Sequence, residues 1–257
     1  MSCALTIGGS DSSGGAGIQA DIKTFTVFKV FGTSALTCVT AQNSLGIQAL
    51  YEISSAIVKS QIHSVLDDMS VSAIKIGMVY SSDIIKTIAL TLDNYTIKNI
   101  VLDPIIWTKK GTHALDKNGL DMLKDHLCKR ALLITPNLDE AGALTGRSIT
   151  NLEEMKWAAR QIYHMGPSYV LIKGGHLPDK PYDVLFDGKK EFISTREKIG
   201  ARAVHGTGCT LSAAITASLA LGMDIYDAVM AAQKYIAAVI QNAMQLGEGF
   251  LQPQHWL

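Results

Sequence analysis

The sequence predicts an α/β fold in which helices cover both faces of a mostly parallel sheet. Short apolar runs alternate with longer runs whose apolar residues recur at helical spacing, and this order is typical of strand–helix–strand units. The short runs are rich in β-branched residues, as in TSALTCVT at 33–40, which is typical of buried strands. Because the 257 residues contain no linker, repeat or change in composition, we expect one domain, residues 1–257.

The expected strands and helices follow one another in order along the chain. The first strand, 3–7, leads through a Gly/Ser loop at 8–15 into an amphipathic helix at 18–30. Further strands are expected at 33–40, 73–76, 100–102, 131–134 and 169–172. Further helices are expected at 54–69, 83–92 and 115–127, from about 138 and from about 152, and at 207–221 and 225–244. Between them, the polar-alternating segments 182–186 and 191–194 flank an Asp-Gly turn and predict a small antiparallel hairpin at the sheet edge.

The composition excludes several classes of protein. Hydrophobic residues make up 47% and charged residues 18%, so the chain can bury a large core and is not disordered. The 23 basic residues balance the 23 acidic ones, which leaves no basic surplus for nucleic acid or an anionic membrane. The four cysteines lack metal-site spacing, and the N-terminus lacks the features of a secretion signal. We therefore expect a cytoplasmic protein.

Candidate site residues gather where the expected strands end. In a sheet covered on both faces, ligands bind beyond the carboxyl ends of the strands. The residues that this rule selects are the loop at 8–15, Gln42, Gly77, Met78, Asp103, Asn137, Lys173 and the loop before Thr207.

The first loop has two possible roles. The segment 15–20 fits the dinucleotide pattern G-x-G-x-x-G/A, but no acid for a ribose lies between Asp21 and Glu52, so a nicotinamide site is disfavoured. The glycines either only turn the chain or allow the backbone to approach a small ligand, with Asp21 on the first helix turn facing it.

The strongest local signal is HGTGCTLSAA at 205–214. Two glycines flank Thr207 directly ahead of a helix of small residues. The backbone N–H groups at such a helix start would point outward with the helix dipole behind them, which suits the charge on a transferring phosphoryl group. The chain has no Walker A sequence and none of the protein-kinase triplets, so its use of ATP would require another architecture.

Seven segments occur together and in order: GGSDSSGGAGIQADIKTF, VTAQNS, AIKIGM, VLDPII, TPNLDEA, LIKGGH and GTGC. Together they resemble the hydroxymethylpyrimidine/phosphomethylpyrimidine kinases of the ribokinase superfamily. The resemblance implies a ribokinase-like three-layer sandwich, ATP and Mg²⁺ as cofactors, a homodimer, and phosphorylation of hydroxymethylpyrimidine and then of its monophosphate in thiamine biosynthesis. Two residues depart from the family: Thr40 is more polar than usual, and Trp107 replaces a smaller residue.

The resemblance also implies a role for each candidate residue. Gln42 would recognise the ring nitrogen and amine of the pyrimidine, as Gln recognises adenine. The other substrate contacts would be Asp21, Gly9, Ala16, Thr40, Met78 and Ile105. ATP would contact Lys173, Asn137 and Thr207, and the metal would be held by Asp103 and Glu140. Gly206, Thr207 and Gly208 would form the anion cradle with Cys209, which would act as a base because a helix N-terminus lowers a thiol pKa.

Several alternatives remain open at this point. A pyridoxal kinase of the same branch is the nearest one, although a pyridine ring lacks the amine that Gln42 would recognise, and one protein could act on both rings. A sensor that keeps the fold without turnover is a second, and a sugar kinase is disfavoured because Cys209 replaces an Asp. Each residue also has a structural alternative: Gln42 could cap a loop, Lys173 could be solvated, and Met78 and Cys209 could belong to the core.

Overall fold

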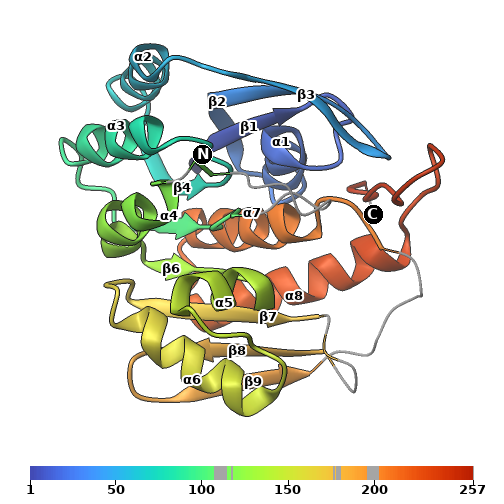
Figure 1. The fold of residues 1–257 in the computed structure, drawn as a ribbon. Helices are drawn as coiled ribbons and strands as arrows, with labels where there is room; N and C mark the ends of the chain where they lie inside the picture. Colours follow the sequence, from blue (N-terminus) through green and yellow to red (C-terminus); the bar gives the residue numbers. More distant parts are fainter. Residues whose placement is uncertain (107–114, 117, 176, 178–180, 196–202, 257) are drawn as a thin grey trace.

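The structure is a computed structural model that describes residues 1–106, 115–116, 118–175, 177, 181–195 and 203–256. Trp107, singled out above, lies outside these residues. The described strands form one sheet in the order β3-β2-β1-β4-β5-β6-β7-β8-β9 (Figure 1). Their bounds are β1 Cys3–Asp11, β2 Phe31–Asn43, β3 Gly46–Glu52, β4 Val71–Ile76, β5 Ile100–Leu102, β6 Leu133–Ile134, β7 Tyr169–Gly174, β8 Tyr182–Phe186 and β9 Glu191–Thr195.

The centre of the sheet is parallel and its edges are antiparallel. Strands β2, β1, β4, β5, β6 and β7 pair in parallel, whereas β3 lies antiparallel on β2 and the β8–β9 hairpin lies antiparallel on β7. The predicted edge hairpin is thereby confirmed. The chain runs from β1 outward to β2 and then returns to β4 on the other side of β1. In sheets of this kind ligands bind where the strand order reverses, beyond the carboxyl ends of the strands, and here these strands are β1 and β4.

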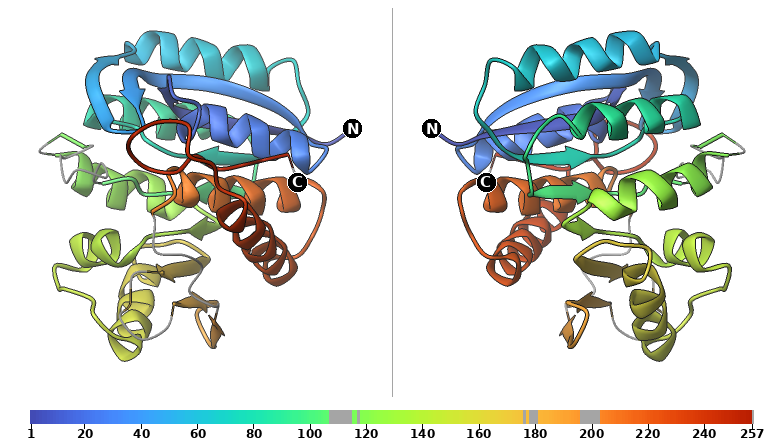
Figure 2. Two further views of the ribbon diagram at one scale, coloured as in Figure 1. Left: turned by 90° about the vertical axis from the view of Figure 1, so that its right-hand side faces the viewer. Right: turned by 90° about the vertical axis from the view of Figure 1, so that its left-hand side faces the viewer.

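Two layers of helices cover the sheet, as the alternating pattern predicts (Figures 1 and 2). One face is covered by α1 Gly17–Val27, α7 Thr207–Ala220 and α8 Ile225–Gln241. The other face is covered by α2 Ser55–Leu66, α3 Ser82–Leu92, α4 Gly119–Met122, α5 Leu138–Thr145 and α6 Leu152–Tyr163. No helix in the described part of the chain is long and apolar enough to cross a membrane.

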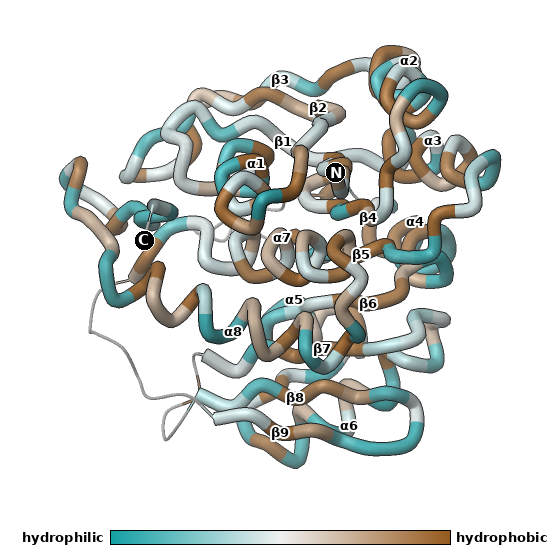
Figure 3. Tube along the Cα trace, turned by 180° about the vertical axis from the view of Figure 1, so that it is seen from behind, coloured by the Kyte–Doolittle hydropathy of each residue, from teal (hydrophilic) through white to brown (hydrophobic). Residues whose placement is uncertain are grey.

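Helix α7 is the central helix of its layer. Every residue from Cys209 to Ala220 is buried, because α7 packs against α1, α8 and the sheet at once. In Figure 3 the tube of α7 shows little hydrophilic colour, whereas α8 alternates between hydrophobic and hydrophilic segments. A helix without a polar face can only be stable inside the protein. The small side chains of α7 allow it to pack closely on the sheet, where it contacts β1, β4 and β5.

Some predicted boundaries are wrong. Strand β1 continues past Ile7 to Asp11, because its last residues pair with β2 beyond a bulge between Gly8 and Ser10. Strand β7 continues to Gly174, so Lys173 lies in the strand rather than after it. The helix expected at 115–127 begins only at Gly119 and continues after α4 as a π-helical turn, Leu123–Leu127.

Candidate active site

The N-terminus of α7 is held against the first loop by a close backbone approach. Gly206 caps the helix with φ +69°, in the left-handed region that favours glycine. A Cβ atom at this position would lie 1.8 Å from the carbonyl oxygen of Gly15. The sequence GTGC therefore allows two loops, distant in sequence, to meet at the tip of the helix. The first N–H groups of α7 have no partner within the helix and can bind an anion.

Lys173 and Asp103 face this helix tip. A Cβ atom on Gly208 would lie 3.3 Å from Lys173 Nζ and 3.8 Å from Asp103 Oδ2. Lys173 Nζ donates a hydrogen bond of 2.9 Å to Asp103 Oδ1. Burial works to raise the pKa of Asp103, but the charges of Lys173 and Lys75 outweigh it and hold the pKa below its ordinary value. Asp103 is therefore an ionised carboxylate beside the anion cradle.

Ser212, one turn into α7, also contacts this carboxylate. Its Oγ lies 3.2 Å from Asp103 Oδ2, and Thr135 Oγ1 donates to Asp103 Oδ1 over 3.2 Å. Ser212 and Thr135 were not among the predicted site residues. Their hydroxyl groups hold the Asp103 carboxylate in place from two different elements.

Asn137 and Glu140 form the start of α5 beside Lys173. Asn137 Oδ1 accepts from the Glu140 N–H over 2.9 Å, and Glu140 Oε2 accepts from the Asn137 N–H over 2.8 Å, which is a complete capping box. An isolated parallel bridge joins Asn137 to Lys173. Burial raises the pKa of Glu140 to about 7, although the nearby Lys173 charge lowers it and Asp103 raises it further.

The residues proposed for Mg²⁺ supply suitable ligand atoms but no closed site. Within the described ranges, no group of three or more His, Cys, Asp or Glu side chains could hold a metal ion. Asp103 and Glu140 offer oxygen atoms, and both lie within electrostatic range of Lys173. Mg²⁺ commonly takes one or two carboxylates and completes its shell with water and substrate phosphates. The donor set therefore fits a magnesium ion that arrives with a nucleotide.

Cys209 lies at the cradle, but its predicted pKa shift is wrong. Burial raises the pKa of the Cys209 thiol to about 11, and the Asp103 and Asp21 charges raise it further. The Lys75 charge and the backbone of Gly17 lower the pKa, but too little to reverse the shift. The helix terminus therefore does not produce a thiolate at neutral pH, because the thiol is buried.

Asp21, a predicted substrate contact, is held by partners inside the protein. Lys75 Nζ pairs with Asp21 Oδ1, and Thr6 Oγ1 donates to Asp21 Oδ2 over 2.6 Å. Both carboxylate oxygens therefore have partners inside the protein, and the Asp21 side chain is only 2% exposed. The charge of Lys75, in the middle of an apolar strand, required a buried acid, and Asp21 is that acid. Its structural role is to join α1 to β4.

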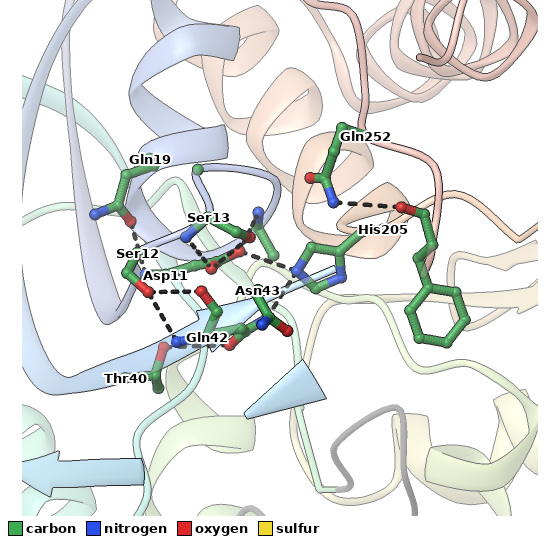
Figure 4. A network of polar contacts seen from close by, with 12 residues as sticks. Asp11, Ser12, Ser13, Gln19, Thr40, Gln42, Asn43, His205 and Gln252 are labelled. Atoms are coloured by element: carbon green, nitrogen blue, oxygen red, sulfur yellow. Dashed lines mark hydrogen bonds and ion pairs between the residues drawn. The ribbon is translucent and has the colours of Figure 1, made fainter. Parts of the chain in front are cut away.

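Gln42 and Thr40, two of the predicted pyrimidine-binding residues, lie together beside His205 (Figure 4). The Gln42 carboxamide lies 2.8 Å from His205 Nε2 at one end and 3.2 Å from Thr40 Oγ1 at the other. His205 directly precedes Gly206, so Gln42 is linked to the α7 cradle through one residue. The Ala16 N–H donates to Asp11 Oδ2 over 2.8 Å, and this bond closes the first loop around the Asp11 carboxylate, which also contacts His205.

The remaining predicted pocket residues lie at neighbouring strand ends. A Cβ atom on Gly9 would lie 2.8 Å from Cys38 Sγ and 3.0 Å from Met78 Cε, so Gly9 and Met78 are in close contact. Ile105 is half-buried two residues after Asp103. Asp11, Lys75 and the role of His205 were not predicted from the sequence. A charged residue inside the apolar run AIKIG was the one signal that could have revealed Lys75.

Comparisons with known proteins agree with this geometry. A family model described as phosphomethylpyrimidine kinase matches residues 11–254. A hydroxymethylpyrimidine/phosphomethylpyrimidine kinase from Bacillus subtilis is 41% identical over 255 residues, which cover 98% of this chain and 94% of that protein. The thiamine biosynthesis bifunctional protein ThiED from Geobacter sulfurreducens is 42% identical over 248 residues, 95% of this chain and 50% of that protein.

A solved structure shows the same fold. The ADP complex of Bacillus subtilis pyridoxal kinase matches with a TM-score of 0.92 and 38% identity, and covers 99% of this chain and 97% of that chain. The predicted ribokinase-like three-layer sandwich is thereby confirmed.

Proposed function

The chain belongs to the phosphomethylpyrimidine kinase family, and from this premise we propose that it transfers the γ-phosphoryl group of ATP to the hydroxymethyl group of hydroxymethylpyrimidine. A second transfer to the resulting monophosphate would give the pyrophosphate used in thiamine biosynthesis. The observation that carries this proposal is the tip of α7, which faces Lys173 and Asp103 on one side and is linked through His205 to Gln42 on the other.

Catalysis would consist mainly of positioning and charge stabilisation. The backbone N–H groups from Thr207 to Cys209 would bind the transferring phosphoryl group. Lys173 and Asn137 would bind the nucleotide, and Asp103 and Glu140 would hold Mg²⁺, which when bound neutralises phosphate charge. Because Lys173 already pairs with Asp103, its ammonium group is held in position before the nucleotide arrives.

The Gln42 carboxamide would recognise the amine and ring nitrogen of the pyrimidine. Gly9, Ala16, Thr40, Met78 and Ile105 would line the pocket around the ring. Ala16 has only a methyl side chain, so the ring can approach the backbone there, and Gly9 leaves room for the Met78 side chain beside it.

Cys209 remains our candidate base for the first transfer, with its high pKa taken into account. The thiolate is then a minor species at neutral pH, and it would accept the proton of the hydroxymethyl group as that oxygen attacks phosphorus. The second transfer starts from a phosphate oxygen that is already ionised, so it requires no base.

A second candidate substrate is pyridoxal, because the chain is 38% identical to a pyridoxal kinase over almost its full length. Pyridoxal also carries a hydroxymethyl group, but its ring offers no amine to Gln42.

One experiment separates these possibilities. The protein is incubated with Mg-ATP and either compound, and products are identified by mass. We expect mono- and diphosphorylated pyrimidine; pyridoxal phosphate alone would overturn the proposal, and no product with either would favour a binding protein.

The homodimer and the cytoplasmic location stay predictions. ATP use is supported by the ADP complex of the similar pyridoxal kinase. The need for Mg²⁺ rests on Asp103 and Glu140 and can be measured by adding EDTA to the same assay.

A further inference from the structure

Asp11 is surrounded by hydrogen-bond donors. Its Oδ1 accepts from the Ser13 N–H and from Ser13 Oγ, each over 2.8 Å, and its Oδ2 accepts from the Ala16 N–H over 2.8 Å. Burial works to raise the pKa of Asp11, but hydrogen bonds from His205 and Ser13 outweigh it and hold the pKa below its ordinary value. Asp11 is therefore an ionised carboxylate, which can only accept hydrogen bonds.

This carboxylate determines the hydrogen on His205. His205 Nε2 lies 2.9 Å from Asp11 Oδ2. Because Asp11 has no hydrogen to donate, Nε2 must carry one, whether the imidazole is neutral or charged. His205 Nε2 is therefore a donor toward everything else that it contacts.

The same nitrogen lies 2.8 Å from one end of the Gln42 carboxamide, the end placed as Nε2 (Figure 4). Two N–H groups cannot bond to each other. The two ends of a carboxamide have nearly the same shape, and hydrogen bonding decides which is oxygen. The end next to His205 must be Oε1, so that the His205 N–H is shared between Asp11 and Gln42.

Thr40 gives the same answer independently. Its Oγ1 donates its hydrogen to the Ser10 carbonyl oxygen over 2.9 Å. Toward Gln42, 3.2 Å away, Thr40 Oγ1 can therefore only accept, and the Gln42 end that it meets must be the NH₂ group. Both neighbours therefore assign the carboxamide in the same way, with Oε1 toward His205 and the NH₂ group toward Thr40.

We propose that His205 is a positioning residue that fixes the direction of the Gln42 carboxamide and so determines which ring edge the pocket accepts. With Oε1 bonded to His205 and one N–H bonded to Thr40, Gln42 keeps one acceptor position and one N–H for a ligand. These suit a heterocycle with an amine beside a ring nitrogen, in one order only. This inference rests on the proposed function, since it concerns the same substrate.

The surroundings hold the His205 ring in place for this role. A Cβ atom on Gly15 would lie 2.8 Å from His205 Cδ2, so the imidazole lies against the first loop. The backbone N–H of His205 donates to the Leu251 carbonyl oxygen over 2.8 Å, which connects this residue to the C-terminal segment. Both the ring and the backbone of His205 therefore have fixed positions.

The test compares His205→Leu with His205→Gln. Leu removes the donor, whereas the side-chain NH₂ of Gln restores one at a similar distance from the backbone. We expect His205→Leu to raise the KM for hydroxymethylpyrimidine about tenfold or more while the KM for ATP changes less than twofold, and His205→Gln to recover most of the loss. The control is His255, a buried residue whose Nδ1 lies 3.0 Å from the Tyr235 hydroxyl oxygen. His255→Leu should lower Tm without changing either KM.

The outcomes separate this inference from the proposed function. A wild-type protein that does not phosphorylate hydroxymethylpyrimidine would overturn the proposed function. An active wild type with an unchanged KM in His205→Leu would overturn only the role of His205. If His205→Leu does not fold, ¹⁵N NMR of the wild-type histidine rings decides, with His205 assigned from the His205→Gln spectrum. We expect a hydrogen on Nε2; a bare Nε2 nitrogen would contradict the inference.

Discussion

At the scale of single residues, Cys209 shows burial opposing a helix terminus. The thiol lies at the start of α7, where the helix dipole favours a thiolate, yet enclosure raises its pKa to about 11. Substrate and nucleotide would bind at the same helix tip. A base of this kind is weak at neutral pH and becomes more effective as the pH rises.

This pKa gives the first transfer a characteristic pH dependence. Below a pKa of about 11, the thiolate fraction rises about tenfold per pH unit. We expect kcat for hydroxymethylpyrimidine to rise with this slope between about pH 7 and 9, and kcat for the monophosphate to stay nearly flat. In Cys209→Ala the first kcat should fall about 100-fold and lose the slope. Cys128→Ala, buried in the opposite helix layer, is the control; an unchanged slope in Cys209→Ala would rule out the base role.

Residue types at strand ends could be predicted from the sequence, but their partners could not. The positions of Asp103, Lys173 and Gln42 follow from the rule that ligands bind beyond parallel strands. The partner of Asp21 could not be predicted, because only the folded chain brings α1 and β4 together and shows that Asp21 meets Lys75. The Asp11–His205 pair joins residues 194 positions apart. No local pattern indicates such a contact.

At the scale of secondary-structure elements, the join between α7 and the first loop depends on Gly206. Gly206→Ala combines a left-handed φ with a Cβ atom placed 1.8 Å from the Gly15 carbonyl oxygen. Gly146 has a similar φ of +72° but no atom within 4 Å of its added Cβ. Gly146→Ala should therefore cost only about 1 kcal/mol of unfolding free energy, and Gly206→Ala clearly more, with loss of nucleotide binding. Chemical denaturation measures both; equal losses would mean that the close approach is unimportant.

The buried pair between α1 and β4 gives another prediction for these elements. Burial works to lower the pKa of Lys75, but the charges of Asp21 and Asp103 raise it above its ordinary value, so the ammonium is charged. Lys75→Met leaves the Asp21 carboxylate buried without its cation and should cost about 3–5 kcal/mol of unfolding free energy. Lys75→Met combined with Asp21→Asn removes both charges and should recover most of that loss.

A double-mutant cycle in chemical denaturation tests this pairing. The coupling energy between the two substitutions should be large and favourable to the pair, because each charge is costly only when the other is missing. Independent, additive losses would show that Asp21 and Lys75 are stabilised by other groups.

At the scale of the whole molecule, the layered architecture was predictable because it depends on a repeated pattern. Alternating strands and helices permit few arrangements other than a covered parallel sheet, and right-handed crossovers reduce these further. The end of β1 at Asp11 was not predictable, since it depends on pairing with β2 beyond a bulge. That residues 1–257 form one domain stays a prediction.

The final prediction concerns the edges of the sheet. Edge strands with exposed apolar side chains favour association between copies of a chain. On the β8–β9 side, the Phe192 ring is 41% exposed and packs on Tyr226 of its own chain at 4.6 Å between centroids, and Ile193 is 44% exposed. On the β3 side, Tyr51 is 74% exposed and Leu45 47% exposed. We therefore expect the homodimer to form through β3, with a twofold axis pairing the same strand of two copies.

Light scattering after size exclusion tests this arrangement. The wild type should show twice the chain mass of 27.6 kDa, because the apolar surface of β3 is covered only in the dimer. Tyr51→Lys replaces the most exposed apolar ring of β3 by a charged side chain in each copy, so it should yield monomers that keep their fold by circular dichroism. Phe192→Lys, at the opposite edge, should remain dimeric. If Phe192→Lys is monomeric and Tyr51→Lys remains dimeric, the interface lies at the β8–β9 hairpin instead. If the wild type is monomeric, the prediction of a homodimer is wrong.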